Sequence, residues 1–162
     1  MPTARKVDVL TNIGSCMELK GEINNAIEKY KEAIALDGST NFKVHEYLGY
    51  AYYKEGRIED AIVEFEKALE LVQDNVAELG DIHYLLGLSY LKSENFTKSQ
   101  QSFQNAIYKN PNSYVYWVSI GILYAQSTQP HDAFECFIKA SNLYSEGFET
   151  CFNMAILYEQ CK

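Results

Sequence analysis

The sequence predicts an all-α fold, a solenoid of antiparallel helix pairs with four full pairs and one terminal helix. An aliphatic residue followed by glycine recurs four times along the chain. These glycines are Gly14, Gly49, Gly87 and Gly121, and they stand 35, 38 and 34 residues apart. An aromatic residue followed three positions later by alanine recurs with the same period, beginning at Tyr30. Two features that share one period of this length indicate a repeat architecture.

The predicted helices are justified by helical spacing and by the breaks between them. In chain order they cover residues 7–19, 23–37, 42–55, 58–73, 79–92, 96–109, 114–127, 130–144 and 148–160. Gly21, Gly38 and Gly56 end the first three helices, because glycine accepts the left-handed conformation found after a helix. Pro111 lies between the sixth and seventh helices, and Pro130 suits the first turn of the eighth.

The faces of the helices explain why they should pair. Gly121 and Tyr124 lie on one face of the seventh helix. Ala133, Phe137 and Ala140 follow one face of the eighth helix at i, i+4 and i+7. Small residues allow two helices to approach closely, and the aromatic side chains fill the space beside them. Each pair therefore buries its apolar face only against its neighbours.

One irregularity interrupts the repeat. The spacing of 38 residues between Gly49 and Gly87 is four residues longer than the shortest spacing. We expect the extra residues, around 72–79, to lengthen the fourth helix or the turn that follows it.

The pattern resembles the tetratricopeptide repeat (TPR), a unit of about 34 residues that carries W-x2-L-G-x2-Y followed by Ala, Phe and Ala. The fourth pair matches it best, from Trp117 through Ala140. The resemblance implies a right-handed superhelix and one domain over residues 1–162, as a fragment of a longer array. The implied repeats cover residues 7–40, 42–76, 80–113 and 114–147, with a partial repeat at 148–162.

The resemblance also implies where a partner would bind. In TPR domains the first helices line a concave groove, with the second, fifth, ninth and twelfth positions of each repeat facing the ligand. Apolar and aromatic residues at these positions are Tyr50, Tyr53, Tyr84, Leu88, Leu91, Val118, Ile122, Phe152 and Ile156. Exposed apolar patches and tyrosines are typical of interaction sites. They predict a protein or peptide partner with apolar anchors. The alternative is that tightly curled repeats bury these positions against one another.

Several other partners are disfavoured. The formal net charge is −8, and no basic stripe offers the Lys and Arg cluster that direct nucleic-acid binding needs. No apolar run approaches the about 18 residues of a membrane span. Some TPR domains hold chaperone tails with a carboxylate clamp of Lys, Asn and Arg. Thr11, Ser15, Glu46 and Tyr50 stand at the corresponding positions, so we expect no clamp.

Enzyme chemistry is also disfavoured. His45, His83 and His131 belong to no HExxH motif, and no phosphate-binding loop or GxSxG occurs. The four cysteines form no CxxC pair. We therefore expect a non-catalytic scaffold without metal or cofactor. The first residues lack the apolar stretch of a signal peptide, which predicts an intracellular protein.

A finer resemblance concerns residues 117–124, WVSIGILY. This stretch is similar to a repeat shared by the TPR subunit of the fungal general transcriptional corepressor and the TPR regions of UTX-type histone demethylases. It implies a nuclear adaptor that links WD-repeat corepressor or chromatin proteins to transcription regulators. The alternative is a constitutive structural subunit of a cytoplasmic assembly of the ciliary-transport, anaphase-promoting or motor-adaptor type. A third class, the targeting region of an enzyme such as O-GlcNAc transferase, is disfavoured because the groove lacks an asparagine ladder.

Overall fold

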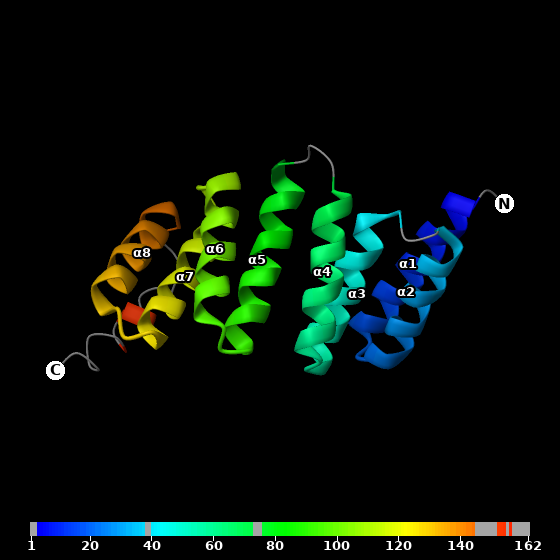
Figure 1. The fold of residues 1–162 in the computed structure, drawn as a ribbon, viewed down its shortest axis with the longest axis horizontal. Coiled ribbons are helices and arrows are strands. Elements are labelled where there is room, and N and C mark those ends of the chain that lie inside the picture. The colour runs from blue at the N-terminus through cyan, green and yellow to red at the C-terminus, as the bar shows by residue number, and fades with distance from the viewer. Residues whose placement is uncertain (1–2, 38–39, 73–75, 145–151, 155, 157–162) are drawn as a thin grey trace. The chain divides into compact units, whose positions relative to one another are not determined.

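The computed structural model describes residues 3–37, 40–72, 76–144, 152–154 and 156, and these are helices joined by short turns. They form two compact units, Met1–Asn75 and Val76–Lys162, which we describe one at a time. The all-α fold of antiparallel helix pairs is confirmed (Figure 1). In the described parts of the chain, no helix is both long and apolar enough to cross a membrane.

The first unit contains two helix pairs. They are α1 (Thr3–Leu19) with α2 (Ile23–Asp37), and α3 (Phe42–Glu55) with α4 (Ile58–Leu71). Helix α3 contacts its own partner α4, and it also contacts α2 and α1 of the preceding pair. Each pair is therefore completed by its neighbour, as the repeat pattern predicts.

The second unit repeats this arrangement. Its pairs are α5 (Val76–Lys92) with α6 (Phe96–Lys109), and α7 (Tyr114–Gln126) with α8 (Pro130–Leu143). Helix α7 contacts α8, α6 and α5. Residues 152–154 and 156 are helical, and Met154 packs against the core around Phe137.

Each helix pair is locked by a glycine that meets an aromatic ring. A Cβ atom added to Gly87 would lie 2.5 Å from the Phe103 ring, and one added to Gly121 would lie 2.5 Å from the Phe137 ring. Gly14 meets Tyr30 and Gly49 meets Phe65 in the same way. These four rings are at most 1% exposed. The two repeating features of the sequence are thus the two sides of one contact.

The turn inside each pair has one backbone conformation. The residue seven positions after the glycine has a positive φ, and these residues are Gly21 (85°), Gly56 (86°), Glu94 (58°) and Thr128 (59°). The next residue's N–H donates to a carbonyl five residues back, for example Arg57 to Tyr52 at 2.9 Å and Gln129 to Tyr124 at 2.8 Å. This bond satisfies a carbonyl that the end of a helix would leave unpaired.

Helix bounds differ from the sequence prediction at several ends. Helices α2, α3 and α6 begin and end where predicted, whereas α4 ends at Leu71 rather than 73. The extra residues of the second repeat therefore do not lengthen the fourth helix. Instead α5 begins at Val76 rather than 79, which adds residues to its N-terminal end.

The remaining differences are small. Helix α1 begins at Thr3 rather than 7, because residues 3–6 contain neither glycine nor proline to stop it. Helices α7 and α8 each end one residue earlier than predicted. Most of the predicted helix at 148–160 lies outside the described residues. The single domain over residues 1–162 and its repeat bounds stay predictions.

Candidate protein-binding site

In the first unit, the predicted binding face lies on α1 and α3, which contact each other. Tyr50 and Tyr53 are on α3, one helical turn apart. The side chain of Tyr50 is 37% exposed, while Tyr53 is half-buried. Tyr50 thus offers an accessible aromatic ring on a helix that is held from both sides.

The charges around Tyr50 are paired with one another. The Lys54 ammonium lies 4.7 Å from the centroid of the Tyr50 ring and 2.9 Å from Oε1 of Glu18 on α1. Its hydrogen bond to Glu18 raises the pKa of Lys54. The Tyr30 hydroxyl on α2 donates to Oε2 of Glu18 at 3.1 Å, and burial raises the pKa of Tyr30 to about 12. One carboxylate therefore joins three helices, and Tyr50 is 37% exposed beside this bonded group.

Polar residues nearer the start of α1 are bonded inside the unit. The Thr11 hydroxyl donates to the Val7 carbonyl at 2.8 Å. The Ser15 hydroxyl is 3.3 Å from the Tyr30 hydroxyl. These two residues stand at ligand-facing positions of the TPR pattern, but their hydroxyl groups already have partners.

In the second unit, Tyr84 is part of an aromatic cluster. Its ring stacks on Tyr116 with centroids 5.0 Å apart and lies 6.0 Å from Phe103. The Tyr116 hydroxyl donates to Oδ1 of Asp81. Burial and this hydrogen bond raise the pKa of Tyr116, so the phenol stays protonated. Tyr84 is half-buried and presents part of its ring only.

The aliphatic positions of the second unit are less open than the sequence suggests. Leu88 and Leu91 pack against the core cluster that contains Phe103 and Ile120. Ile122 packs against the neighbouring cluster, and Val118 is a buried member of that cluster with 6% exposure. For Val118 the prediction of an open groove position is corrected, because the side chain fills space between α7 and α8. Packing against the core buries part of the side chains of Leu88, Leu91 and Ile122.

Two predicted residues lie near the C-terminal end. Phe152 is 53% exposed and Ile156 is 41% exposed. With Tyr50 they are the most accessible of the nine predicted residues. Whether any of the nine contacts a partner stays a prediction.

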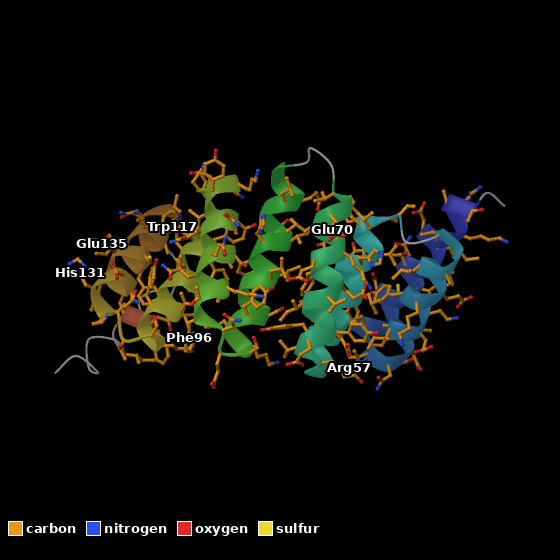
Figure 2. The ribbon with its side chains drawn as sticks, in the orientation of Figure 1. Arg57, Glu70, Phe96, Trp117, His131 and Glu135 are labelled. Carbon is orange, nitrogen blue, oxygen red and sulfur yellow. The ribbon has the colours of Figure 1, made fainter. Side chains whose placement is uncertain are left out.

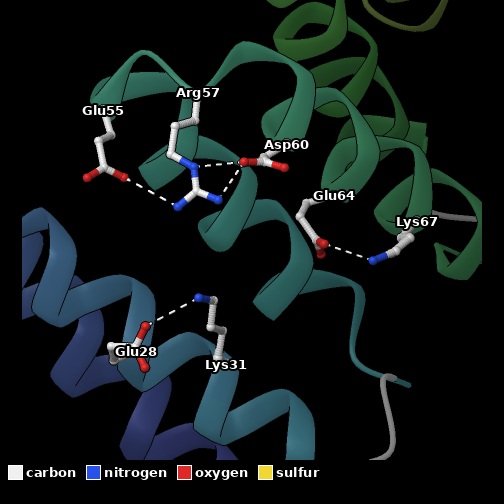
Figure 3. A network of polar contacts seen from close by, with 7 residues as sticks. All are labelled: Glu28, Lys31, Glu55, Arg57, Asp60, Glu64 and Lys67. Atoms are coloured by element: carbon white, nitrogen blue, oxygen red, sulfur yellow. Dashed lines mark hydrogen bonds and ion pairs between the residues drawn. The ribbon is translucent and has the colours of Figure 1, made fainter.

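Sequence reasoning missed a buried polar contact between two helices. His45 on α3 is 2% exposed, and its Nδ1 lies 2.6 Å from Oε2 of Glu64 on α4. Lys67 donates to Oε1 of Glu64 at 2.8 Å, and Figure 3 shows this pair beside the Arg57–Asp60 pair. Nε2 of His45 has no hydrogen-bond partner among the described residues. The contact between His45 and Glu64 ties α3 to α4. In the described ranges, no group of three His, Cys, Asp or Glu side chains could hold a metal ion.

Lys54 was also missed. It stands one position beyond the four ligand-facing positions of its repeat, whereas Glu18 occupies the last of these positions in the preceding repeat. A comparison of adjacent first helices, with a one-residue offset, would have placed these opposite charges together.

Comparisons with known proteins also find tetratricopeptide repeats in this chain. Family models described as "TPR repeat" match residues 19–56 and 49–94, and a model described as "Tetratricopeptide repeat" matches residues 81–113. Together these matches run from residue 19 to residue 113, more than half of the chain.

Two curated relatives are similar over most of this chain. Superkiller protein 3 of Schizosaccharomyces pombe is 28% identical over an alignment of 147 positions, which covers 84% of this chain and 11% of that protein. TPR repeat-containing protein MJ1428 of Methanocaldococcus jannaschii is 27% identical over an alignment of 165 positions, which covers 97% of this chain and 27% of that protein. The chain thus spans a small part of either relative.

Solved structures share the fold. The MamA protein has a TM-score of 0.82 at 22% identity, covering 96% of this chain and 82% of that one. YrrB, described as a TPR protein with an unusual peptide-binding site, has a TM-score of 0.74 at 22% identity, covering 93% and 75%. The Cut9–Hcn1 hetero-tetramer of the APC/C has a TM-score of 0.85 at 17% identity, covering 91% and 29%.

Proposed function

The chain belongs to the tetratricopeptide repeat family, and from this we propose that it binds a segment of a partner protein through aromatic and aliphatic side chains on its first helices. The TPR fold is typically a non-catalytic scaffold for protein–protein interaction. The proposed partner has apolar anchors, since the accessible residues at the predicted positions are Tyr50, Phe152 and Ile156.

The observation that carries this proposal is the environment of Tyr50. Its ring is accessible, whereas the charged groups beside it, Glu18 and Lys54, already bind each other at 2.9 Å. A partner that covers the ring does not have to leave an unpaired charge behind. Tyrosine also gives a large contact area at a low cost in side-chain entropy, which is why it is common at binding hot spots.

Site-specific photo-crosslinking tests this proposal. A benzophenone amino acid placed at Tyr50 should crosslink to a partner protein in cell extract, and excess unlabelled wild-type chain should compete the product away. Tyr108 on α6, which is 83% exposed and outside the predicted face, is the matched control. Equal crosslinking at residues 50 and 108, or no product that is competed away at residue 50, contradicts the proposal.

Among protein-binding scaffolds, we infer that this chain is a transcriptional corepressor or chromatin adaptor in the nucleus. The support is the likeness of residues 117–124 to the corepressor and UTX-type repeats. Purified WD-repeat corepressor should bind the chain and lose affinity when Tyr50 is changed to Glu. A fluorescent fusion should concentrate in the nucleus. If the chain instead purifies from cytoplasm in fixed stoichiometry with a large assembly, it is a constitutive structural subunit.

A further inference from the structure

A pocket of about 280 Å³ lies over α7, between α6 and α8. Both of these helices contact α7. Ile107 of α6 and Ile120 of α7 line one part of the pocket, and Trp117 and Tyr124 of α7 add two aromatic rings. The pocket uses none of the nine predicted groove residues. It is therefore a surface separate from the one proposed above.

The acidic side of the pocket comes from α8. Asp132, Glu135 and Lys139 follow one face of this helix and all line the pocket. Burial raises the pKa of the neighbouring Cys136 to about 11, so its thiol is uncharged at neutral pH. Two carboxylates and one ammonium leave the pocket with net negative charge. His131, whose ring is 3.9 Å from Glu135, is largely exposed.

Trp117 is held in place on two sides. Its indole Nε1 donates to the Pro111 carbonyl at 2.8 Å, and the Lys139 ammonium lies 4.5 Å from the centroid of its ring. Figure 2 labels Trp117, and Glu135 on α8, at this end of the second unit. The indole ring held by these two contacts forms one wall of the pocket.

A second pocket of about 250 Å³ shares Trp117 and Lys139 with the first. Pro111 and Leu143 provide its apolar lining, and Asn142 adds an amide. Lys139 thus stands between an acidic pocket and an apolar one.

The first unit has bonded polar side chains at the equivalent position. Counted from the repeat glycine, Trp117 corresponds to His45, because each precedes its glycine by four residues. Cys136 and Lys139 correspond to Glu64 and Lys67 by the same count from Phe137 and Phe65. In the first unit His45 and Lys67 each bond to the carboxylate of Glu64. In the second unit Trp117 and Cys136 cannot form such a contact, and the acidic groups of the pocket are Glu135, one residue before Cys136, and Asp132, four residues before it.

We propose that the pocket over Trp117 receives a lysine or arginine side chain from a protein segment, whose neighbouring apolar side chain enters the pocket beside Leu143. The aliphatic stem of the basic residue would lie along Ile107 and Ile120, as long basic side chains do on apolar surface. Its charged head would reach Asp132 and Glu135. Charge complementarity decides the sign of the guest, because the two carboxylates of the pocket outnumber its one ammonium, that of Lys139, which already lies over the Trp117 ring.

The test uses the tryptophan as its own reporter, because Trp117 is the single tryptophan of the chain. The probes are acetylated, amidated ten-residue Gly/Ser peptides with one arginine and one leucine, separated by zero to four residues. At least one spacing should change Trp117 fluorescence in a saturable way. The same peptide with citrulline, which has arginine's shape without its charge, should bind at least ten-fold more weakly.

Paired variants locate the site. Asp132→Asn with Glu135→Gln should weaken binding of the arginine peptide at least ten-fold, with the circular dichroism of the helices unchanged. Glu59→Gln with Glu70→Gln removes the same charge from exposed positions on α4 and should leave the affinity unchanged. The proposal is overturned if no arginine or lysine peptide gives saturable binding up to millimolar concentration, if citrulline peptides bind equally, or if both double variants behave alike.

Discussion

Gly87 shows how one missing atom determines a contact. The ring of Phe103 occupies the space where a Cβ would lie and is 0% exposed, so a Cβ at position 87 would have to displace a buried ring. Gly87→Ala should lower the free energy of unfolding by about 1–2 kcal/mol, because overpacking outweighs the better helix propensity of alanine. Urea unfolding measures this value.

Gly80 on the same helix is the matched control. A Cβ there would lie 3.4 Å from the nearest described atom, Cβ of Lys109, which is an ordinary contact. Gly80→Ala should raise the free energy of unfolding by up to about 1 kcal/mol. If both alanine variants are stabilised, the contact between glycine and the aromatic ring is not what restricts position 87.

Glu64 makes the first unit sensitive to acid. Burial alone would raise its pKa, but the hydrogen bonds from His45 and Lys67 outweigh burial and lower it. A carboxylate with a lower pKa in the folded state stabilises the fold above its unfolded pKa of about 4.3. This contribution disappears as the pH falls through the folded pKa.

The variant Glu64→Gln tests this contribution of Glu64 to stability. It should lose about 1–3 kcal/mol of unfolding free energy at pH 7, and its difference from wild type should shrink as the pH falls from about 5 to about 3. Urea unfolding at each pH measures both chains. Glu59→Gln, an exposed acid on the same helix, controls for the loss of one charge. A difference that stays constant between pH 7 and pH 3 argues against an ionised Glu64 in this pair.

At the scale of the helix pair, the left-handed turn sets a second prediction. Thr128 has a φ of 59°, which is unfavourable for a β-branched residue, whereas Gly56 holds the equivalent place in α3–α4 without strain. Thr128→Gly should raise the free energy of unfolding by roughly 0.5–1 kcal/mol, and Gly56→Thr should lower it by about 1–2 kcal/mol. Thermal unfolding of both variants checks the opposite signs. Two changes of the same sign contradict this account of the turn.

Elements whose formation depends on local pattern could be predicted from the sequence. The four glycines and the aromatic residue 16 positions after each one placed every helix pair, because both sides of the locking contact repeat. The start of α5 differs from the prediction. Residues 72–79 contain no glycine or proline that would mark a break before Val76, and none of them matches a residue that recurs in the other repeats.

The binding face was predicted less well than the fold. Val118 and Tyr50 stand at equally ligand-facing positions of the pattern, yet Val118 is 6% exposed and Tyr50 is 37% exposed. Exposure depends on which side chains surround a position. Val118 belongs to the buried cluster of Phe137 on α8, whereas Tyr50 is bordered by Lys54 of its own helix. Pairs such as His45–Glu64 join helices across 19 residues and leave no periodic trace in a single sequence.

At the scale of the whole molecule, charge governs solubility. The formal charge is −8 at pH 7, and the isoelectric point is about 4.9. Self-repulsion vanishes near that pH, so soluble protein after centrifugation should be lowest near pH 5. Changing the exposed residues Glu59 and Glu70 to Lys should move the minimum to higher pH. A minimum that stays in place would show that unfolding rather than net charge causes the loss.

The turn shared by the helix pairs has an evolutionary consequence. Glycine occupies it at positions 21 and 56, yet Glu94 and Thr128 adopt the same left-handed backbone with the same N–H bond to the preceding helix. The packing of the two helices therefore determines the turn, and the turn residue only adjusts its energy. Within this chain the turn position accepts residues other than glycine, at a cost in energy, whereas all four positions that meet an aromatic ring are glycine. Divergence can then alter the loops without changing the angle between the helices.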